Sequence, residues 1–286
     1  MPSKTFHIFA PAKINLFLHI TGKRDDGYHT LQSLMIFADA GDDLEFSSQE
    51  NFSIEVKGIF TDALPLTQDN LVYKAARLLS EDYKTPLSGK IILTKNLPVA
   101  SGIGGGSADA AAALKGLSQL WSLPDEPSRL QKVAQKVGAD VPACLYCRPV
   151  WVEGIGEKLI PISGMPPIYL VLVNPLVPVA TAAVFQCFGG SFSPLFPSPR
   201  EWGMPLTDLD TFRNDLTEAA IAVAPVVKDV LGAFSNTEGC LLHRLSGSGA
   251  TCFGIYEDAT AARKAADTLK TLHPEWWIVP ACQNKN

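Results

Sequence analysis

Apolar and polar positions alternate along residues 9–20, which predicts a β-strand. One face carries aliphatic side chains and the other carries a mixed set: Ile14, Leu16, Leu18 and Ile20 against Lys13, Asn15, Phe17 and His19. Side chains two residues apart lie on the same face of a strand, so Lys13 and Asn15 project side by side. On this pattern alone, a solvent-facing row without a function is an equally good interpretation.

The rest of the pattern alternates between helices and strands. Helical spacing of apolar residues follows a cap at Asp69-Asn70 and recurs over 128–137, 181–188, 216–223, 225–234 and 259–272. Short apolar runs predict strands at 31–37, 91–93, 150–152, 158–162, 168–173, 241–245, 252–256 and 277–279. Runs 44–46 and 52–56 predict a hairpin around 47–51, and the Gly-, Ser- and Pro-rich residues 189–205 predict an irregular excursion.

A loop at 163–167 is the expected domain boundary, which gives one domain over 1–163 and a second over 164–286. The second half runs strand, helices, two strands, helix, strand. That order is typical of a split β-α-β layer.

The glycine-rich segment 98–108 is the strongest chemical signal in the chain. Its four glycines, at 102, 104, 105 and 106, allow positive φ and close approach to a ligand. Ser107 is the expected N-cap of a helix that runs to about Trp121, with Asp109 near the positive end of its dipole. Unpaired N–H groups at a helix start bind anions, and phosphate is the expected anion. The alternative is a glycine-rich turn that only caps a core helix.

Spacing separates this segment from two better-known phosphate loops. The chain has no Gly-x-x-x-x-Gly-Lys-Ser/Thr sequence, so it is not a P-loop NTPase. Gly102 and Gly104 begin a dinucleotide fingerprint, but Ser107 stands at its sixth position and no apolar strand runs directly into the glycines.

Composition indicates an ordinary globular protein. The 286 residues are 47% apolar and 19% charged with a net charge of −5, so we expect no nucleic-acid partner, and local geometry must bind any phosphate. No 18-residue apolar run and no leader-like N-terminus occur, so we expect a cytoplasmic protein with no membrane partner. The six cysteines are expected to be reduced core thiols and stand at positions 144, 147, 187, 240, 252 and 282. The Cys144-x-x-Cys147 pair lacks a second Cys/His pair at metal spacing.

Asp140 precedes Val-Pro in the segment 138–142. An aspartate there is typical of a helix N-cap, and local sequence alone favours that role.

The Lys13 strand, the glycine loop and a small-residue bend at 246–249 together resemble the GHMP kinases. The central motif of that family, Pro-x-x-x-Gly-Leu-Gly-Ser-Ser, stands here as Pro98-Val-Ala-Ser-Gly-Ile-Gly-Gly-Gly-Ser107. Four further segments resemble the branch whose substrate is 4-diphosphocytidyl-2-C-methyl-D-erythritol: Ala-Lys-Ile-Asn-Leu (12–16), Asp-Gly-Tyr-His (26–29), Gly-Ala-Asp-Val-Pro (138–142) and Leu-Ser-Gly-Ser-Gly-Ala (245–250). The resemblance thus covers nearly the whole chain.

The resemblance implies ATP-dependent phosphorylation of the 2-hydroxyl of that substrate, with Mg²⁺, in the non-mevalonate route to isoprenoids. It also implies an α+β (α/β) fold of two domains: an N-terminal mixed-sheet α/β domain and a C-terminal split β-α-β, ferredoxin-like domain, with the active site in the cleft between them. A small-molecule substrate is the expected partner, and the expected state is a monomer or weak homodimer.

The resemblance also implies roles for individual residues. Asp140 falls on the catalytic base, and Lys13 on the lysine that keeps it ionised. The expected ATP-binding residues are Asn70, Lys95, Pro98, Val99, Ala100, Ser101, Gly102, Ile103, Gly104, Gly105, Gly106, Ser107 and Ala108. The expected substrate-binding residues are Asn15, Tyr28, His29, Thr181 and Phe185, and the C-terminal bend is Ser246, Gly247, Ser248 and Gly249. Tyr28 and His29 fall where the family holds the cytosine; without that context, packing and surface roles are favoured.

One position departs from the pattern. Ala100 stands where many relatives carry glycine, and because alanine is small we expect little consequence. Two other identities stay open. A non-catalytic relative is expected to lose Lys13 or Asp140, and a mevalonate or homoserine kinase is expected to lack Asp-Gly-Tyr-His; the chain keeps all of these residues.

Overall fold

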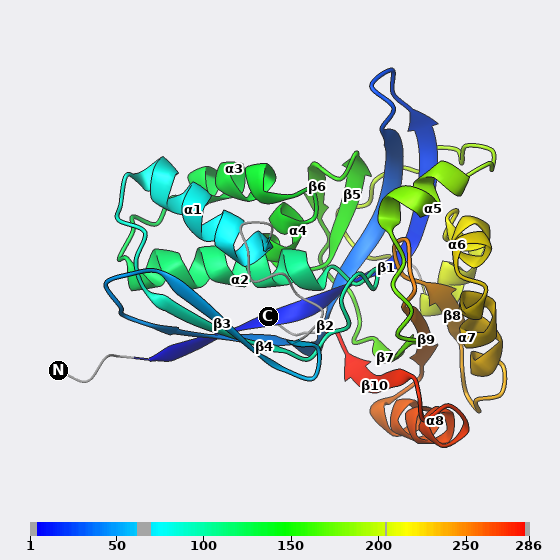
Figure 1. Cartoon of the computed structure of the whole chain (residues 1–286). Coiled ribbons are helices and arrows are strands. Elements are labelled where there is room, and N and C mark those ends of the chain that lie inside the picture. Colours follow the sequence, from blue (N-terminus) through cyan, green and yellow to red (C-terminus); the bar gives the residue numbers. More distant parts are fainter. Residues whose placement is uncertain (1–4, 62–69, 204, 284–286) are drawn as a thin grey trace. The chain divides into compact units, whose positions relative to one another are not determined.

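A computed structural model describes residues 5–61, 70–203 and 205–283 (Figure 1). The chain forms two compact units: residues 1–12, 41–99 and 104–147 make the first, and residues 13–40, 100–103 and 148–286 make the second. Two long strands, β1 (Phe6–Lys23) and β2 (His29–Ser47), contribute to both units. The units are therefore discontinuous in sequence, and the domain division at 163 stays a prediction.

The first unit contains a mixed sheet. Strand β4 (Lys90–Lys95) pairs antiparallel with the end of β2 and parallel with β3 (Ser53–Gly58). The predicted hairpin of 44–46 with 52–56 is therefore wrong, because β4 lies between its two strands. Burial explains the order: Ile91 and Leu93 are buried in β4, whereas Glu55 and Lys57 are exposed in β3, and charged strands suit sheet edges.

The described residues of the first unit also form the helices α1 (Leu71–Tyr83), α2 (Gly105–Leu120), α3 (Pro127–Val137) and α4 (Val141–Tyr146). The cap of α1 is confirmed at Asn70, whose side chain accepts a hydrogen bond from the Val72 N–H at 2.9 Å, while Asp69 lies outside the described residues. Gly116 lets α2 approach the sheet closely, since a Cβ there would lie 2.2 Å from the Phe46 ring.

The second unit contains two sheet regions. Strand β2 pairs antiparallel with β5 (Val150–Gly154), which pairs with β6 (Lys158–Pro161). A separate four-stranded sheet has the order β10 (Trp277–Cys282), β7 (Tyr169–Asn174), β9 (Cys252–Tyr256), β8 (Leu242–Leu245), and all its pairs are antiparallel. This confirms the predicted split β-α-β pattern.

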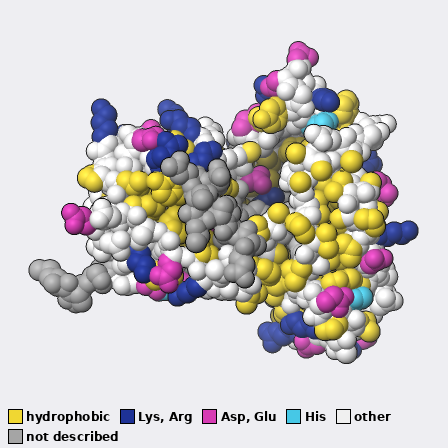
Figure 2. Space-filling model, viewed as in Figure 1, with side chains coloured by type: hydrophobic (Ala, Val, Ile, Leu, Met, Phe, Trp, Pro, Cys, Tyr) yellow, Lys and Arg dark blue, Asp and Glu magenta, His cyan; other side chains and the backbone are white. Residues whose placement is uncertain are grey.

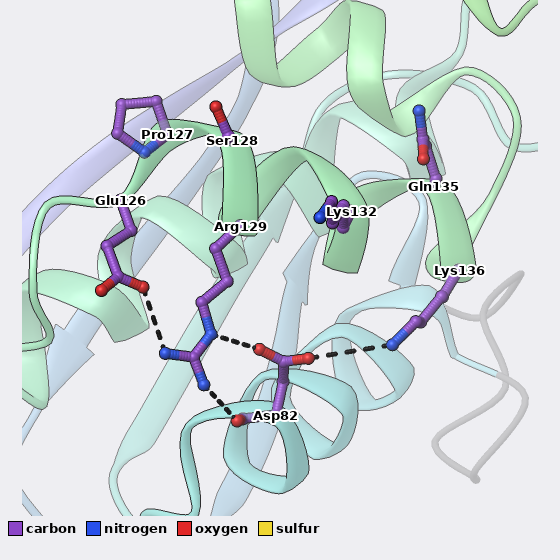
Figure 3. A pocket seen from close by; sticks show the side chains of 8 residues that line it. All are labelled: Asp82, Glu126, Pro127, Ser128, Arg129, Lys132, Gln135 and Lys136. Atoms are coloured by element: carbon purple, nitrogen blue, oxygen red, sulfur yellow. Dashed lines mark hydrogen bonds and ion pairs between the residues drawn. The ribbon is translucent and has the colours of Figure 1, made fainter.

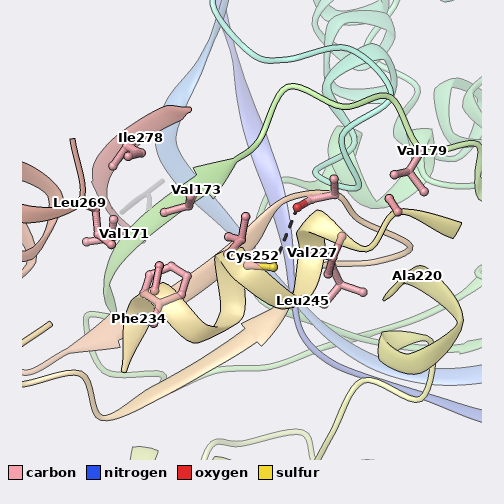
Figure 4. Close-up of a cluster of buried hydrophobic side chains, with 14 of the residues drawn as sticks. Val171, Val173, Val179, Ala220, Val227, Phe234, Leu245, Cys252, Leu269 and Ile278 are labelled. Atoms are coloured by element: carbon pink, nitrogen blue, oxygen red, sulfur yellow. Dashed lines mark hydrogen bonds between the residues drawn. The ribbon is translucent and has the colours of Figure 1, made fainter. Parts of the chain in front are cut away.

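Helices cover that sheet through one apolar core (Figure 4). They are α5 (Thr181–Cys187), α6 (Thr217–Val223), α7 (Val226–Phe234) and α8 (Ala259–Leu272), and the short 3-10 helix η2 (Leu206–Thr211) precedes α6 in the chain. Val171 and Val173 of β7, Phe234 of α7 and Leu269 of α8 all belong to this core. Alternate residues of β7 thus supply the face that the helices bury.

Residues 189–203 form neither helix nor strand beyond a single bridge at Glu201, as the excursion predicted. Cys144, Cys147 and Cys252 are buried as expected, but Cys187 is exposed at the end of α5, so the expectation of a core thiol is wrong there. Among the described residues, no helix combines the length and the apolar character needed to span a bilayer.

Candidate active site

Between Ala10 and Ile20 both faces of strand β1 are buried, which excludes the solvent-facing alternative for Lys13 and Asn15. Lys13 is 4% exposed and Asn15 is 1% exposed. The Lys13 ammonium donates a hydrogen bond to Asn15 Oδ1 at 2.8 Å, and Asn15 Nδ2 donates to Ser33 Oγ at 2.7 Å. A buried amine costs free energy unless it is paired, so this polar row has a specific role.

The structure brings three separately predicted motifs into hydrogen-bond contact within the second unit. The Lys13 N–H donates to the Ile103 carbonyl at 2.9 Å, which joins the strand to the glycine loop. The Asn15 N–H donates to Ser246 Oγ at 3.1 Å, and that hydroxyl donates to the Gly102 carbonyl at 3.2 Å. Strand, loop and C-terminal bend therefore form one assembly.

Gly102 explains why this loop needs glycine. Its φ is +78°, and a Cβ there would lie 2.5 Å from the Ser246 carbonyl oxygen and 2.7 Å from Gly249 N. The loop and the bend pack backbone against backbone. Ala100 also adopts a left-handed conformation, with φ +51°, which costs a non-glycine residue about 1–2 kcal/mol. The expectation that alanine has little consequence here is thus corrected, because the backbone conformation itself favours glycine.

The helix after the loop begins earlier than predicted. Gly104 is the N-cap, in the left-handed region with φ +66°, and α2 starts at Gly105. Ser107 therefore lies inside the first turn and is not the cap. No side chain caps α2, so its first N–H groups keep their capacity to bind an anion.

A buried ion cluster lies in the first unit, beside the first turn of α2. The Lys95 ammonium donates to Asp109 Oδ2 at 2.7 Å and also pairs with Asp42, and the three side chains are 1%, 2% and 0% exposed. Burial raises the pKa of the Asp109 carboxyl to about 8, against the attraction of Lys95. Burial alone lowers the pKa of Lys95, but the Asp109 and Asp42 carboxylates outweigh it and raise that pKa. Asp109 thus lies just beyond the first turn of α2, and its buried carboxyl faces Lys95.

Asp140 occupies the N-cap position of α4, as predicted, but its side chain makes no capping hydrogen bond to that helix. Such a bond goes to the N–H of the second or third helical residue, and the second is Pro142, which has no N–H. The side chain is half-buried. Its carboxylate is therefore not committed to the capping role that local sequence favoured.

Aromatic side chains gather at the turn between β1 and β2. The His29 ring stacks on Phe185 with centroids 5.5 Å apart and meets the edge of Phe188 at 5.8 Å. Tyr28 is 63% exposed, so it is not the packing residue that the sequence alone favoured. Figure 2 shows further exposed hydrophobic side chains on this unit. Burial lowers the pKa of His29, and the positive charge of Lys23 lowers it further, so the neutral ring is favoured. Thr181 Oγ1 lies 2.9 Å from Ser248 Oγ, which links α5 to the bend.

A hollow of about 960 Å³ on the first unit lies along α3 and the end of α1 (Figure 3). None of the predicted site residues is among the residues that line it. Arg129 donates to Asp82 Oδ2 at 2.7 Å and to Glu126 Oε2 at 3.1 Å, and it lies 3.9 Å over the Tyr83 ring. The paired side chains of Arg129 and Asp82 tie α3 to α1.

Sequence reasoning missed three residues of these arrangements. Ser33 and Asp42 are polar residues of a long strand without a motif around them, and Phe188 stands in a segment that predicts only a short helix. No local pattern marks them; their roles come from partners distant in the sequence.

Two family models match the chain. The model described as GHMP kinases N terminal domain matches residues 70–148, and the model described as GHMP kinases C terminal matches residues 201–274. The fold, the glycine loop and its helix are those of GHMP kinases. A homoserine kinase from Cytophaga hutchinsonii shares this fold at a TM-score of 0.73 and 19% identity, over 99% of this chain and 96% of its own.

Curated relatives narrow the family further. A protein of Paramagnetospirillum magneticum named 4-diphosphocytidyl-2-C-methyl-D-erythritol kinase is 53% identical, with 97% of this chain and 98% of its own length covered. A protein of the same name from Cereibacter sphaeroides is 47% identical over 96% and 97%. A crystal structure of 4-(cytidine 5'-diphospho)-2C-methyl-D-erythritol kinase superposes with a TM-score of 0.80 at 30% identity, over 98% of this chain and 100% of that one. The chain belongs to the 4-diphosphocytidyl-2-C-methyl-D-erythritol kinase family.

Proposed function

We propose that this protein transfers the γ-phosphoryl group of ATP to the 2-hydroxyl of 4-diphosphocytidyl-2-C-methyl-D-erythritol, in the non-mevalonate route to isoprenoid precursors. The observation that carries the proposal is the hydrogen-bonded assembly of strand β1, the glycine loop and the C-terminal bend. The chain's curated relatives are named 4-diphosphocytidyl-2-C-methyl-D-erythritol kinase. Cytoplasmic location and a monomeric or weakly dimeric state stay predictions.

Phosphoryl transfer needs alignment and charge stabilisation more than covalent chemistry. The uncapped start of α2 and the loop from Pro98 to Ala108 supply N–H groups for the ATP phosphates. Asn70, at the start of α1, is proposed to contact the adenosine. The resemblance places Lys95 near the adenosine as well. Because two carboxylates hold its buried ammonium, we propose that Lys95 affects ATP binding by positioning the backbone.

Mg²⁺ is proposed to accompany ATP and to neutralise its phosphate charge. Among the described residues, no group of three or more His, Cys, Asp or Glu side chains could hold a metal ion. That arrangement fits Mg²⁺, which is usually bound by substrate phosphates, water and one or two protein oxygens. The half-buried Ser107 hydroxyl, in the first turn of α2, is the oxygen we propose for that role.

Asp140 is proposed as the base that accepts the proton of the attacking hydroxyl. An aspartate carboxylate is a typical acceptor for the proton of an attacking hydroxyl in phosphoryl transfer, and this one stands at the N-cap position of α4. Lys13 is proposed to supply positive charge that favours the ionised base and the transferring phosphoryl group. Each of these two roles can be tested by substituting the residue in a protein that still folds.

The aromatic group at Tyr28, His29 and Phe185 is proposed to hold the cytosine. Exposed and stacked rings provide faces for a base, and a neutral imidazole both donates and accepts hydrogen bonds, which matches the amino and ring-nitrogen edge of cytosine. Asn15 and Thr181 are proposed to bind the methylerythritol and diphosphate portion, since both contact residues of the C-terminal bend.

ATP consumption with a panel of substrates tests the proposal. The cytidine substrate should be phosphorylated, while mevalonate, homoserine and galactose should give no turnover above the background ATPase rate. Preferential turnover of any other member of the panel would contradict the substrate assignment.

A further inference from the structure

The glycine loop is anchored at both ends by the same three buried side chains. On the side before the loop, Asp42 Oδ1 accepts hydrogen bonds from the backbone N–H groups of Asn96 at 2.6 Å and Leu97 at 2.9 Å. On the side after the loop, Asp109 belongs to α2, one turn beyond its first residue. The Lys95 ammonium bonds to both carboxylates, so it connects the two anchors.

The cluster also touches the start of the phosphate-binding helix. A Cβ on Gly105 would lie 3.1 Å from Lys95 Nζ and 3.6 Å from the Leu97 side chain. The first residue of α2 therefore packs directly on the ammonium. Any movement of Lys95 changes where the N–H groups of this turn point.

Stability does not account for such a cluster. Burying charges costs desolvation energy that ion pairing only partly recovers, and apolar replacements of similar size are often as stable. Asp109 Oδ1, moreover, is buried without a hydrogen-bond partner in the described part of the chain. A purely structural contact has no need of an incompletely bonded carboxyl group.

We propose that the Lys95–Asp42–Asp109 cluster is a positioning device for ATP, which ties the two ends of the glycine loop together and fixes the direction of its N–H groups. The three residues act through the loop and do not touch the nucleotide. The inference rests on the proposed binding of ATP by the loop. It does not depend on how the cytidine substrate is bound.

Two substitutions at one position separate positioning from packing. Asp109→Leu keeps the approximate volume and leaves Lys95 with Asp42, so the buried charge stays balanced, but it removes the tie to α2. Asp109→Asn keeps an acceptor for the ammonium. Leu79→Ala is the control, since this side chain is fully buried in α1 and its truncation lowers stability without removing a hydrogen bond or an ion pair.

The measurement is calorimetric binding of a non-hydrolysable ATP analogue with Mg²⁺, with KM for both substrates alongside. The Kd of Asp109→Leu should rise about tenfold, the loss expected for one charge-assisted hydrogen bond, while Asp109→Asn and Leu79→Ala stay within about twofold. The KM of the cytidine substrate should stay unchanged in all three variants. If Asp109→Leu does not fold, Asp109→Ala is measured in its place.

Equal Kd values for wild type and Asp109→Leu would overturn the inference, and so would an Asp109→Asn variant as weak as Asp109→Leu. A wild-type protein that binds no ATP analogue would instead contradict the proposed function, together with this inference. The two failures are therefore distinguishable.

Discussion

The Lys13 ammonium donates a 2.8 Å hydrogen bond to Asn15 Oδ1, two residues along the same strand face. The Asn15 amide then donates to Ser33 Oγ, whose hydroxyl donates to the Phe17 carbonyl at 2.6 Å. An ammonium group and an amide nitrogen can only donate, so the direction of the first two bonds is determined. Asn15 therefore orients Lys13, and is itself oriented by Ser33.

Asn15→Ala should lower kcat about tenfold, because Lys13 loses the group that holds its ammonium in place. KM for ATP should change less than twofold. Thr21→Ala is the matched control, since Thr21 lies on the same strand and its hydroxyl bonds to Thr30 Oγ1 at 3.1 Å. Steady-state kinetics of both variants decide the matter, and equal kcat values for the two would show that Lys13 does not depend on Asn15.

Gly102→Ala should destabilise the fold by about 2–4 kcal/mol, from its positive φ and from the overlap with Ser246 and Gly249. Gly106→Ala, four residues on, should be neutral or stabilising by up to about 1 kcal/mol, because it lies in α2 and its Cβ meets only a Leu71 methyl at 3.5 Å. Urea unfolding of both variants measures the difference. A Gly102→Ala variant as stable as wild type would exclude the tight contact between loop and bend.

The Asp109 carboxyl predicts a pH dependence of stability. An aspartate in an unfolded chain has a pKa of about 3.9, whereas burial raises the pKa of Asp109 in the folded protein to about 8. Between these values the folded state binds a proton that the unfolded state has lost, so the free energy of unfolding falls as pH rises, and this contribution levels off above pH 8.

Asp109→Asn removes that proton-binding difference. The stability of wild type relative to Asp109→Asn should therefore decrease between pH 5 and pH 8, with a limiting slope of about 1.4 kcal/mol per pH unit. Urea unfolding at five pH values gives the comparison. Parallel stability curves for the two proteins would show that Asp109 titrates in its ordinary range.

His29→Ala should raise KM for the cytidine substrate and reduce the preference for it over its uridine analogue, because a lost hydrogen bond weakens discrimination between base edges. Phe192→Ala is the control: this ring is 53% exposed and stacks on Phe188, without a contact to His29. KM for ATP should stay constant in both variants. An unchanged cytidine-to-uridine preference in His29→Ala would mean that other groups recognise the base.

Local sequence predicted the elements and several chemical groups well. Alternation predicted β1, helical spacing predicted α1 and α8, and the glycines predicted a loop before a helix. It predicted less well where distant residues decide the outcome. Strand β4 lies between β2 and β3 because its buried residues suit the centre of the sheet. A hairpin prediction from loop length does not consider that a later strand can pair with both of the strands that the loop connects.

The site shows the same limit. Lys13, Asn15 and Gly102 were marked by pattern or resemblance, whereas Ser33 and Asp42 have roles only because the fold brings partners to them. The preference of serine for N-cap positions predicts Ser107 as the cap, but Gly104, three residues earlier and in a left-handed conformation, is the N-cap of α2. Preferences for single residues yield to backbone geometry where glycines are clustered.

The most direct test of the account is ³¹P NMR of a reaction that contains ATP, Mg²⁺ and 4-diphosphocytidyl-2-C-methyl-D-erythritol. The account predicts a new phosphomonoester resonance beside an intact diphosphate, with one ADP formed per product molecule. It also predicts a rate about 10²–10⁴-fold lower for a folded Asp140→Asn variant, the usual contribution of a general base. Release of inorganic phosphate alone, cleavage of the substrate diphosphate, or an Asp140→Asn variant as fast as wild type would contradict it.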